Sequence, residues 1–227
     1  MTRRANATVA GATFLIYIAA GISSMVLFRH AVGSGGVIER LAGVAQHPGT
    51  FGIVLLLGLV QSFSALVLAM TLWAITRDVD PDIAMLGLIC RVIEGAIAAL
   101  AVSDSLSLRW LATATGIDAP DAVSRHALGA YLLNGGAALS ATFFAVGSTA
   151  FTWLLLRGRL IPALLAWIGV FASVLLAVAL PLQLAGFLHG PITAAVWLPM
   201  LAFEVPVAVW FLAKGVARPV ATASQAP

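Results

Sequence analysis

Charged residues are scarce in this sequence. Asp, Glu, Lys and Arg make up only 9% of its 227 residues, whereas soluble domains contain about 25%. Hydrophobic residues make up 61%, and the mean hydropathy is +1.05. A water-soluble fold of this size cannot bury so much apolar surface in its core. The composition therefore excludes an ordinary soluble enzyme and predicts that lipid surrounds the protein.

Other features are also lacking, and each lack excludes a class of function. Cys90 is the only cysteine, so no disulfide can form within the chain. The excess of 12 basic over 9 acidic residues gives a net charge of only +3, which does not indicate a nucleic-acid partner. The sequence contains no Gly-x-Ser-x-Gly elbow, Walker loop, His-Glu-x-x-His motif or dinucleotide fingerprint. We therefore expect no cofactor and no hydrolysis by these common motifs.

What the sequence does contain is six long apolar runs. A helix needs about 20 residues to cross the hydrocarbon core, and lipid leaves no other way to satisfy the backbone of a single span. The first run is longer than the apolar core of a signal peptide, about 7 to 15 residues, and is interpreted as a span. The sequence predicts an all-α integral membrane bundle of six transmembrane helices, at Val9–Phe28, Phe51–Ile75, Ile83–Val102, Ala127–Leu156, Leu160–Ala185 and Ile192–Ala213.

The residues between the runs predict where the helices begin and turn. Asp80 followed by Pro81 is typical of a helix N-cap and first turn. The segment Asp118 to Asp121 predicts a second helix start. The third signal is Arg157-Gly158-Arg159, which leaves so little loop that the fourth and fifth spans must form a tight antiparallel hairpin.

Two longer connections have patterns of their own. Apolar residues recur at helical spacing from Val37 to Ala45, which predicts a short helix on the membrane surface. The connection from Ser103 to Arg125 mixes leucines and Trp110 with charged residues, and is interpreted as a partly interfacial cap.

Basic residues near the span ends predict the orientation. An inside N-terminus assigns seven basic residues to the cytoplasmic side and four to the outer side. The seven are Arg3, Arg4, Arg77, Arg157, Arg159, Lys214 and Arg218, and the four are Arg29, Arg40, Arg109 and Arg125. We therefore expect both termini in the cytoplasm, one membrane domain over residues 1–217, and a short disordered tail over residues 218–227.

Two stretches carry a family resemblance. Leu72 to Ile97, LWAITRDVDPDIAMLGLICRVIEGAI, contains a short basic loop followed by a helix with Arg91-x-x-Glu94. Leu155 to Val170, LLRGRLIPALLAWIGV, contains a basic hairpin followed by proline, tryptophan and glycine. Both resemble the bacterial six-span membrane proteins of the domain of unknown function 4386 family, apart from Gly158, where a serine-like residue is expected. The resemblance implies six helices and a multi-pass protein of the cell inner (plasma) membrane, and implies no activity.

Three charged residues fall inside the predicted spans. Arg91 and Glu94 lie about 12 and 16 Å from the start of the third span at 1.5 Å per residue, and their spacing of three puts them on one helix face. Glu204 lies about 14 Å from the cytoplasmic end of the sixth span by the same rise. All three are near the midplane, where a charge costs at least about 2.5 to 3.5 kcal/mol and is by default a functional hypothesis.

One arginine can neutralise only one of the two carboxylates. In the functional interpretation, Glu94 or Glu204 is a proton donor or acceptor, Arg91 is the charge partner, and Gln61 and Asn134 add ligand contacts. The best guess is a midplane pocket that binds or acts on a small apolar or lipid-like molecule. The alternatives are a small proton-coupled transporter, and an accessory or regulatory protein in which the three charges only hold helices together.

The remaining partners follow from the surroundings. Membrane lipids are expected to contact the spans, and the sequence does not predict an oligomeric state or decide whether the protein is an enzyme. The four histidines, His30, His47, His126 and His189, all fall at outer span ends and are interpreted as interfacial residues, with no metal site expected. Glycines such as Gly129, Gly135, Gly136 and Gly147 predict close helix packing.

Overall fold

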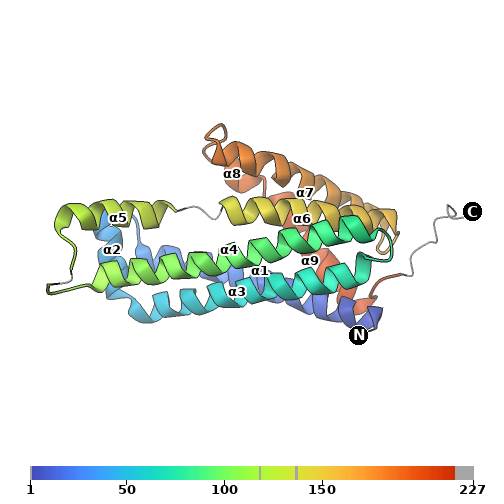
Figure 1. The fold of residues 1–227 in the computed structure, drawn as a ribbon, viewed down its shortest axis with the longest axis horizontal. Coiled ribbons are helices and arrows are strands. Elements are labelled where there is room, and N and C mark those ends of the chain that lie inside the picture. Colours follow the sequence, from blue (N-terminus) through green and yellow to red (C-terminus); the bar gives the residue numbers. More distant parts are fainter. Residues whose placement is uncertain (1, 118, 136–137, 218–227) are drawn as a thin grey trace, which may run out of the picture. The chain divides into compact units, whose positions relative to one another are not determined.

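A computed structural model describes residues 2–117, 119–135 and 138–217. The protein is all-helical, with 84% of it in helices, and the described residues contain no strand (Figure 1). The helices are α1 (Arg3–Val32), α2 (Val37–Gln46), α3 (Pro48–Thr76), α4 (Pro81–Thr113), α5 (Ala122–Asn134), α6 (Ala138–Arg157), α7 (Ala163–Leu184), α8 (Ile192–Ala195) and α9 (Leu198–Ala213).

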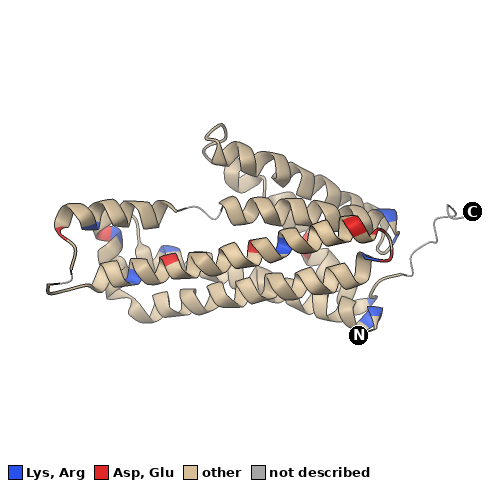
Figure 2. Ribbon diagram, in the orientation of Figure 1, with Lys and Arg blue, Asp and Glu red and all other residues tan. Residues whose placement is uncertain are grey.

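Six segments of the described chain are long and apolar enough to cross a membrane, which confirms the predicted six-span bundle. Four of them are α1, α3, α4 and α7. The other two combine short and long helices, namely α5 with α6 and α8 with α9. Charged residues are few along these helices (Figure 2). The protein is therefore a multi-pass membrane protein that contacts lipid.

The contacts within the chain define two compact units. The first unit is made by the described residues of the ranges 1–15, 64–95 and 138–227, and the second by those of the ranges 16–63 and 96–137. The helices α1, α3 and α4 each contribute to both units. The single domain over residues 1–217 stays a prediction, and the predicted tail, residues 218–227, lies outside the described residues.

Glycines let helices of the first unit approach one another closely. A Cβ atom on Gly169 of α7 would lie 2.6 Å from the Phe203 ring of α9. A Cβ atom on Gly11 of α1 would lie 2.6 Å from the Ala208 carbonyl oxygen, also on α9. Both distances are shorter than a van der Waals contact, so only glycine fits at these crossings. Small residues serve the same purpose in many membrane bundles.

The hairpin between α6 and α7 is confirmed, and its turn is a Schellman motif. Leu160 N–H donates to the Leu155 carbonyl and Arg159 N–H donates to the Leu156 carbonyl, both at 3.0 Å. Arg159 takes the left-handed position with φ of 49°, where glycine is usual. Gly158 precedes it because a Cβ atom there would lie 2.6 Å from Val79 Cγ2, which explains the absence of a serine-like residue.

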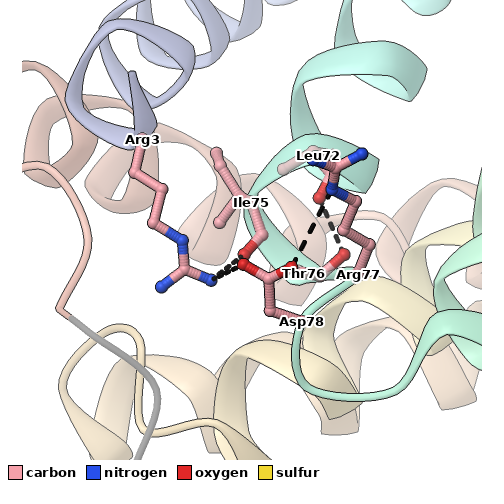
Figure 3. A network of polar contacts seen from close by, with 6 residues as sticks. All are labelled: Arg3, Leu72, Ile75, Thr76, Arg77 and Asp78. Carbon is pink, nitrogen blue, oxygen red and sulfur yellow. Dashed lines mark hydrogen bonds and ion pairs between the residues drawn. The ribbon is translucent and has the colours of Figure 1, made fainter. Parts of the chain in front are cut away.

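Arginine side chains near the N-terminus bind the ends of other helices at one end of the first unit. Figure 3 shows the contacts of Arg3. Arg3 donates to the Ile75 carbonyl at 2.9 Å and pairs with Asp78 at 3.3 Å. Arg4 donates to the Ala213 carbonyl at the C-terminus of α9 at 3.1 Å, where a cation is favoured. The ends of α1, α3 and α9 therefore meet on one side, as the six-span topology requires. The assignment of that side to the cytoplasm stays a prediction.

The predicted helix starts are also confirmed. The Asp80 carboxylate accepts a hydrogen bond from Ile83 N–H at 3.2 Å and also pairs with Arg157 at 2.9 Å. The Asp121 carboxylate accepts from Ser124 N–H at 2.7 Å at the start of α5. This second bond lowers the pKa of Asp121 below its ordinary value, with the Ser124 backbone N–H as the main cause.

The second unit has its own apolar core. The short helix predicted from Val37 is confirmed as α2, and the Glu39 carboxylate accepts from Gly36 N–H at 3.0 Å at its start. Its apolar face packs against protein: Leu41 and Val44 are buried in a core with Phe51, Leu108 and Leu111. Leu108 and Leu111 of this core belong to α4.

The predicted third span ends at Val102, but α4 continues to Thr113, so the first half of the connection from Ser103 to Arg125 is helix and not loop. Two local effects make this possible. The Ser105 and Ser107 hydroxyls donate to the carbonyls four residues before them, at 3.0 and 3.1 Å, so polar residues do not end the helix. Leu108 and Leu111 each gain burial to 1% exposure, which a loop would not provide.

The predicted fourth span, Ala127 to Leu156, is not one regular helix. The structure has α5 ending at Asn134 and α6 beginning at Ala138. Gly135 follows α5 with extended backbone, at ψ of 121°, and residues 136–137 lie outside the described residues. Glycine favours such an interruption because its backbone is the least restrained of all residues.

Candidate functional site

Arg91 and Glu94 form an ion pair inside α4. Arg91 Nη1 lies 2.8 Å from Glu94 Oε2, and the side chains are 1% and 3% exposed. The spacing of three residues that predicted their common helix face brings them together within one helix. Both charges are buried, and their mutual attraction offsets part of the cost of removing each from water.

Helix α6 holds this pair in place. Arg91 Cζ lies 4.7 Å from the centre of the Phe144 ring, a cation–π distance. The stem of Arg91 passes next to Gly147, where a Cβ atom would lie 3.0 Å from Arg91 Cγ. The Ser140 hydroxyl donates to the Glu94 carbonyl at 3.1 Å. The prediction of close packing at Gly147 is confirmed, and the packing serves an ion pair.

Glu204 on α9 is the second carboxylate of this region. It is 7% exposed and interacts electrostatically with both Arg91 and Glu94. Among the residues that the structure describes, no side chain lies within hydrogen-bond or ion-pair distance of the Glu204 carboxylate. The three charges therefore divide into a closed pair, Arg91 with Glu94, and a separate acid.

The Glu204 side chain lines a cavity of about 20 Å³ within the first unit. That space suffices for about one water molecule, and the cavity is partly open to its surroundings. Its walls come from α1, α3, α6 and α9 and are mostly apolar. Four phenylalanines line it, namely Phe14, Phe151, Phe203 and Phe211.

Two hydroxyl side chains of α6 also line the cavity. Thr152 is 2% exposed, and its hydroxyl already lies 3.1 Å from the Ser173 hydroxyl of α7 and 3.2 Å from the Thr149 carbonyl. Ser148 is half-buried. Their spacing of four residues places both on one face of α6, and this spacing is the sequence signal that could have identified them.

The proline after Glu204 adds a backbone acceptor. Pro206 lies inside α9 and has no N–H group, so the carbonyl of Ala202, four residues earlier, loses its usual helical partner. The helix nevertheless continues through this position. Pro206 therefore releases a backbone acceptor two residues before Glu204 without breaking the helix.

The other two predicted ligand residues belong to the second unit. Gln61 on α3 packs against α1, where a Cβ atom on Gly21 would lie 2.7 Å from Gln61 Nε2. Asn134 is exposed at the last position of α5. The structure brings together Arg91, Glu94 and Glu204 within the first unit, and a ligand role for Gln61 and Asn134 stays a prediction.

Two of the four histidines lie close together in the second unit. His30 and His47 contact each other edge to face at 5.5 Å. Within the described ranges, no group of three or more His, Cys, Asp or Glu could hold a metal ion. Gly129 packs closely as predicted, since a Cβ atom there would lie 2.8 Å from Val37 Cγ1. Gly135 contacts only carbonyls of its own turn, and Gly136 is not among the described residues.

Comparison with known proteins identifies a family to which the chain is similar. The model of a family described as a domain of unknown function, DUF4386, matches residues 9–215. No curated protein matches the chain, and no solved structure matches it.

Proposed function

The chain belongs to the DUF4386 family of unknown function, and starting from this membership we propose that it is a membrane protein whose Glu204 cavity binds, or acts on, a small and mostly apolar molecule. In this proposal Glu204 is the proton donor or acceptor for the polar head of that molecule. Arg91 and Glu94 position the acid electrically and do not contact the ligand. The ligand reaches the cavity from the lipid phase.

The observation that carries the proposal is a buried acid without a side-chain partner on the wall of an apolar cavity. A carboxyl group in hydrocarbon is costly unless it is neutralised or hydrogen-bonded. Arg91 is already engaged with Glu94 at 2.8 Å. The partner of Glu204 must therefore be something that enters the cavity, whether a proton, a water molecule or the head of a ligand.

The size and lining of the cavity favour a ligand with a small head and an apolar body. The enclosed space of about 20 Å³ accepts a group about as large as water. The phenylalanines and leucines around it offer contact to hydrocarbon, which is the usual composition of a small-molecule site. The chemistry available is hydrogen bonding and proton transfer at the Glu204 carboxyl oxygens.

The direct test is to identify small molecules that purify with the protein. Wild type, Glu204→Leu and Ser148→Leu are purified in detergent. The small molecules bound to each protein are then extracted and compared by mass spectrometry. Glu39→Gln is the matched control, because Glu39 is an exposed acid of the second unit and glutamine can keep its bond to Gly36 N–H.

The proposal expects at least one molecule enriched with wild type and with Glu39→Gln and lost from both cavity variants. Ser148→Leu fills the cavity and leaves the acid intact. Loss of the molecule from this variant would therefore show that binding needs the space in the cavity and not only the charge of Glu204. Identical extracts from wild type and Glu204→Leu would overturn the proposal.

Orientation and location extend the proposal. The basic residues described at one end of the first unit, Arg3, Arg4, Arg77 and Arg157, belong to the set assigned to the cytoplasm. The excess of seven basic residues over four supports an inner-membrane protein with both termini inside the cell. The test is labelling with a thiol reagent that does not cross the membrane, on single-cysteine variants at Thr2 and Gly116 with Cys90 replaced. We expect position 116 to react from outside the cell. Reaction at position 2 alone would reverse the assignment.

A further inference from the structure

We infer that the head group taken by the Glu204 cavity is a cation, the ammonium group of a small apolar amine. This inference rests on the proposed function and names the chemical class of its ligand. It is carried by three properties of the site: its charge, its aromatic lining and its size.

The charge of the region is unbalanced. Arg91 contributes one positive charge, and Glu94 and Glu204 contribute two negative charges when ionised. Arg91 pairs with Glu94, because Arg91 Nη1 and Glu94 Oε2 lie 2.8 Å apart and both side chains are buried. An incoming cation would complete the balance, whereas a carboxylate or phosphate head would add a third negative charge to a buried site.

The charged groups that act on Glu204 come from one helix. Arg91 and Glu94 both lie on α4, and the residues that line the cavity from α1, α3 and α6 carry no charge. No arginine or lysine lines the cavity in the described part of the chain. An anionic ligand would find no counter-charge there, and an ammonium group finds one in Glu204.

The cavity lining suits a cation as well as hydrocarbon. Phe14, Phe151, Phe203 and Phe211 are each at most 6% exposed and line the cavity beside the acid. Aromatic faces attract ammonium and guanidinium groups most strongly away from water. The neighbouring ion pair already has one such contact outside the cavity lining, because the Arg91 guanidinium lies 4.7 Å from the Phe144 ring centre.

Size separates the remaining head groups. An ammonium group is about as large as water and donates up to three hydrogen bonds, and it therefore matches a space of about 20 Å³. A hydroxyl head has the same size but lacks the charge. The decisive comparison is therefore between an amine, an alcohol and a carboxylate that carry the same alkyl chain.

The experiment measures binding of isotope-labelled n-butylammonium, 1-butanol and butyrate to the full-length protein in lipid nanodiscs, with empty nanodiscs as background. Wild type is compared with Glu204→Gln, which keeps the shape and removes the charge, and with Glu39→Gln as the control acid. We expect saturable butylammonium binding to wild type and to Glu39→Gln, weakened at least tenfold by Glu204→Gln. Butanol and butyrate should bind at least tenfold more weakly than the amine to wild type.

Each other result has a defined meaning. If butanol or butyrate binds as well as the amine and depends on Glu204, the cation inference fails and the proposed function stands. If the amine binds equally to wild type and Glu204→Gln, the inference fails because the charge is not recognised. If none of the three probes binds above the nanodisc background, the cation inference is overturned, and the extraction experiment decides separately whether the proposed function fails with it.

Discussion

Replacing Arg91 with methionine tests whether the charge pair or the separate acid holds the first unit together. Methionine keeps an unbranched stem beside Gly147 and can contact the Phe144 ring through its sulfur. The substitution therefore removes the charge and keeps much of the packing. It leaves Glu94 buried at 2% exposure without the cation that lies 2.8 Å away.

The expected cost follows from this burial. Removing one partner of a buried ion pair costs about 3 to 5 kcal/mol, which is roughly a hundredfold to a few thousandfold in the unfolding equilibrium. Glu94→Met should cost a similar amount, because it leaves Arg91 buried without its counter-charge. The double variant Arg91→Met/Glu94→Met removes both charges and should lie within about 1 kcal/mol of wild type, or above it. Glu204→Gln breaks no ion pair and should cost under about 1 kcal/mol.

The assay is reversible unfolding in mixed detergent micelles, followed by circular dichroism, on the four variants and wild type. The coupling energy between Arg91 and Glu94 should be at least about 3 kcal/mol in the double-mutant cycle. Additive single and double effects would refute the assignment of a structural pair. A Glu204→Gln variant as unstable as Glu94→Met would show that Glu204 belongs to the structural cluster and has no separate function.

Three further predictions concern other parts of the fold. Gly169→Ala should lower stability by about 1 to 3 kcal/mol, because the new Cβ would lie 2.6 Å from the Phe203 ring; Gly52→Ala, where no atom outside its own helix lies within 4 Å, should be neutral or stabilising, and equal unfolding midpoints for the two would contradict the packing argument. Arg159→Gly should raise stability by up to about 1 kcal/mol, since it relieves a left-handed backbone at the cost of glycine's entropy, whereas Gly158→Ser should lower it; thermal unfolding measures both, and a loss in Arg159→Gly would argue against the Schellman turn. Acidification should loosen the start of α5: the pKa of Asp121 is lowered in the folded state, so its stabilising effect is present above the ordinary Asp pKa and is lost as the pH falls through the lowered value. Hydrogen exchange at Ser124 N–H should accelerate in acid beyond the intrinsic rate change, and Asp121→Asn should remove this extra pH dependence; an unchanged dependence in that variant would exclude the cap as its cause.

Features that depend on local sequence were predictable. The N-caps at Asp80 and Asp121 need only a carboxylate before a helix, and their bonds to Ile83 and Ser124 lie within one turn. The Arg91–Glu94 pair needs only a spacing of three on one helix. The number of spans follows from length and hydropathy, which lipid imposes on each helix separately.

Features that depend on distant contacts were not predictable. Nothing in the local pattern distinguishes Phe14, Phe151 and Phe203, which line the cavity, from the other phenylalanines among the 11 of the chain. The extension of α4 to Thr113 was missed for the same reason. The serines of this segment are typical of a loop. The segment is helical because Leu108 and Leu111 pack in a core with residues more than fifty positions earlier in the chain, such as Leu41.

The two buried acids differ, because Glu94 is held in an ion pair and Glu204 is open to an apolar cavity. The most direct measurement is chemical. Diisopropylcarbodiimide, an apolar reagent, adds to protonated carboxyl groups that it can reach from lipid, and mass spectrometry of peptides from treated membranes locates the adduct. We expect modification of Glu204, little modification of Glu94, and protection of Glu204 by butylammonium. Modification of Glu94 as fast as Glu204, or of neither residue, would contradict this difference between the two acids.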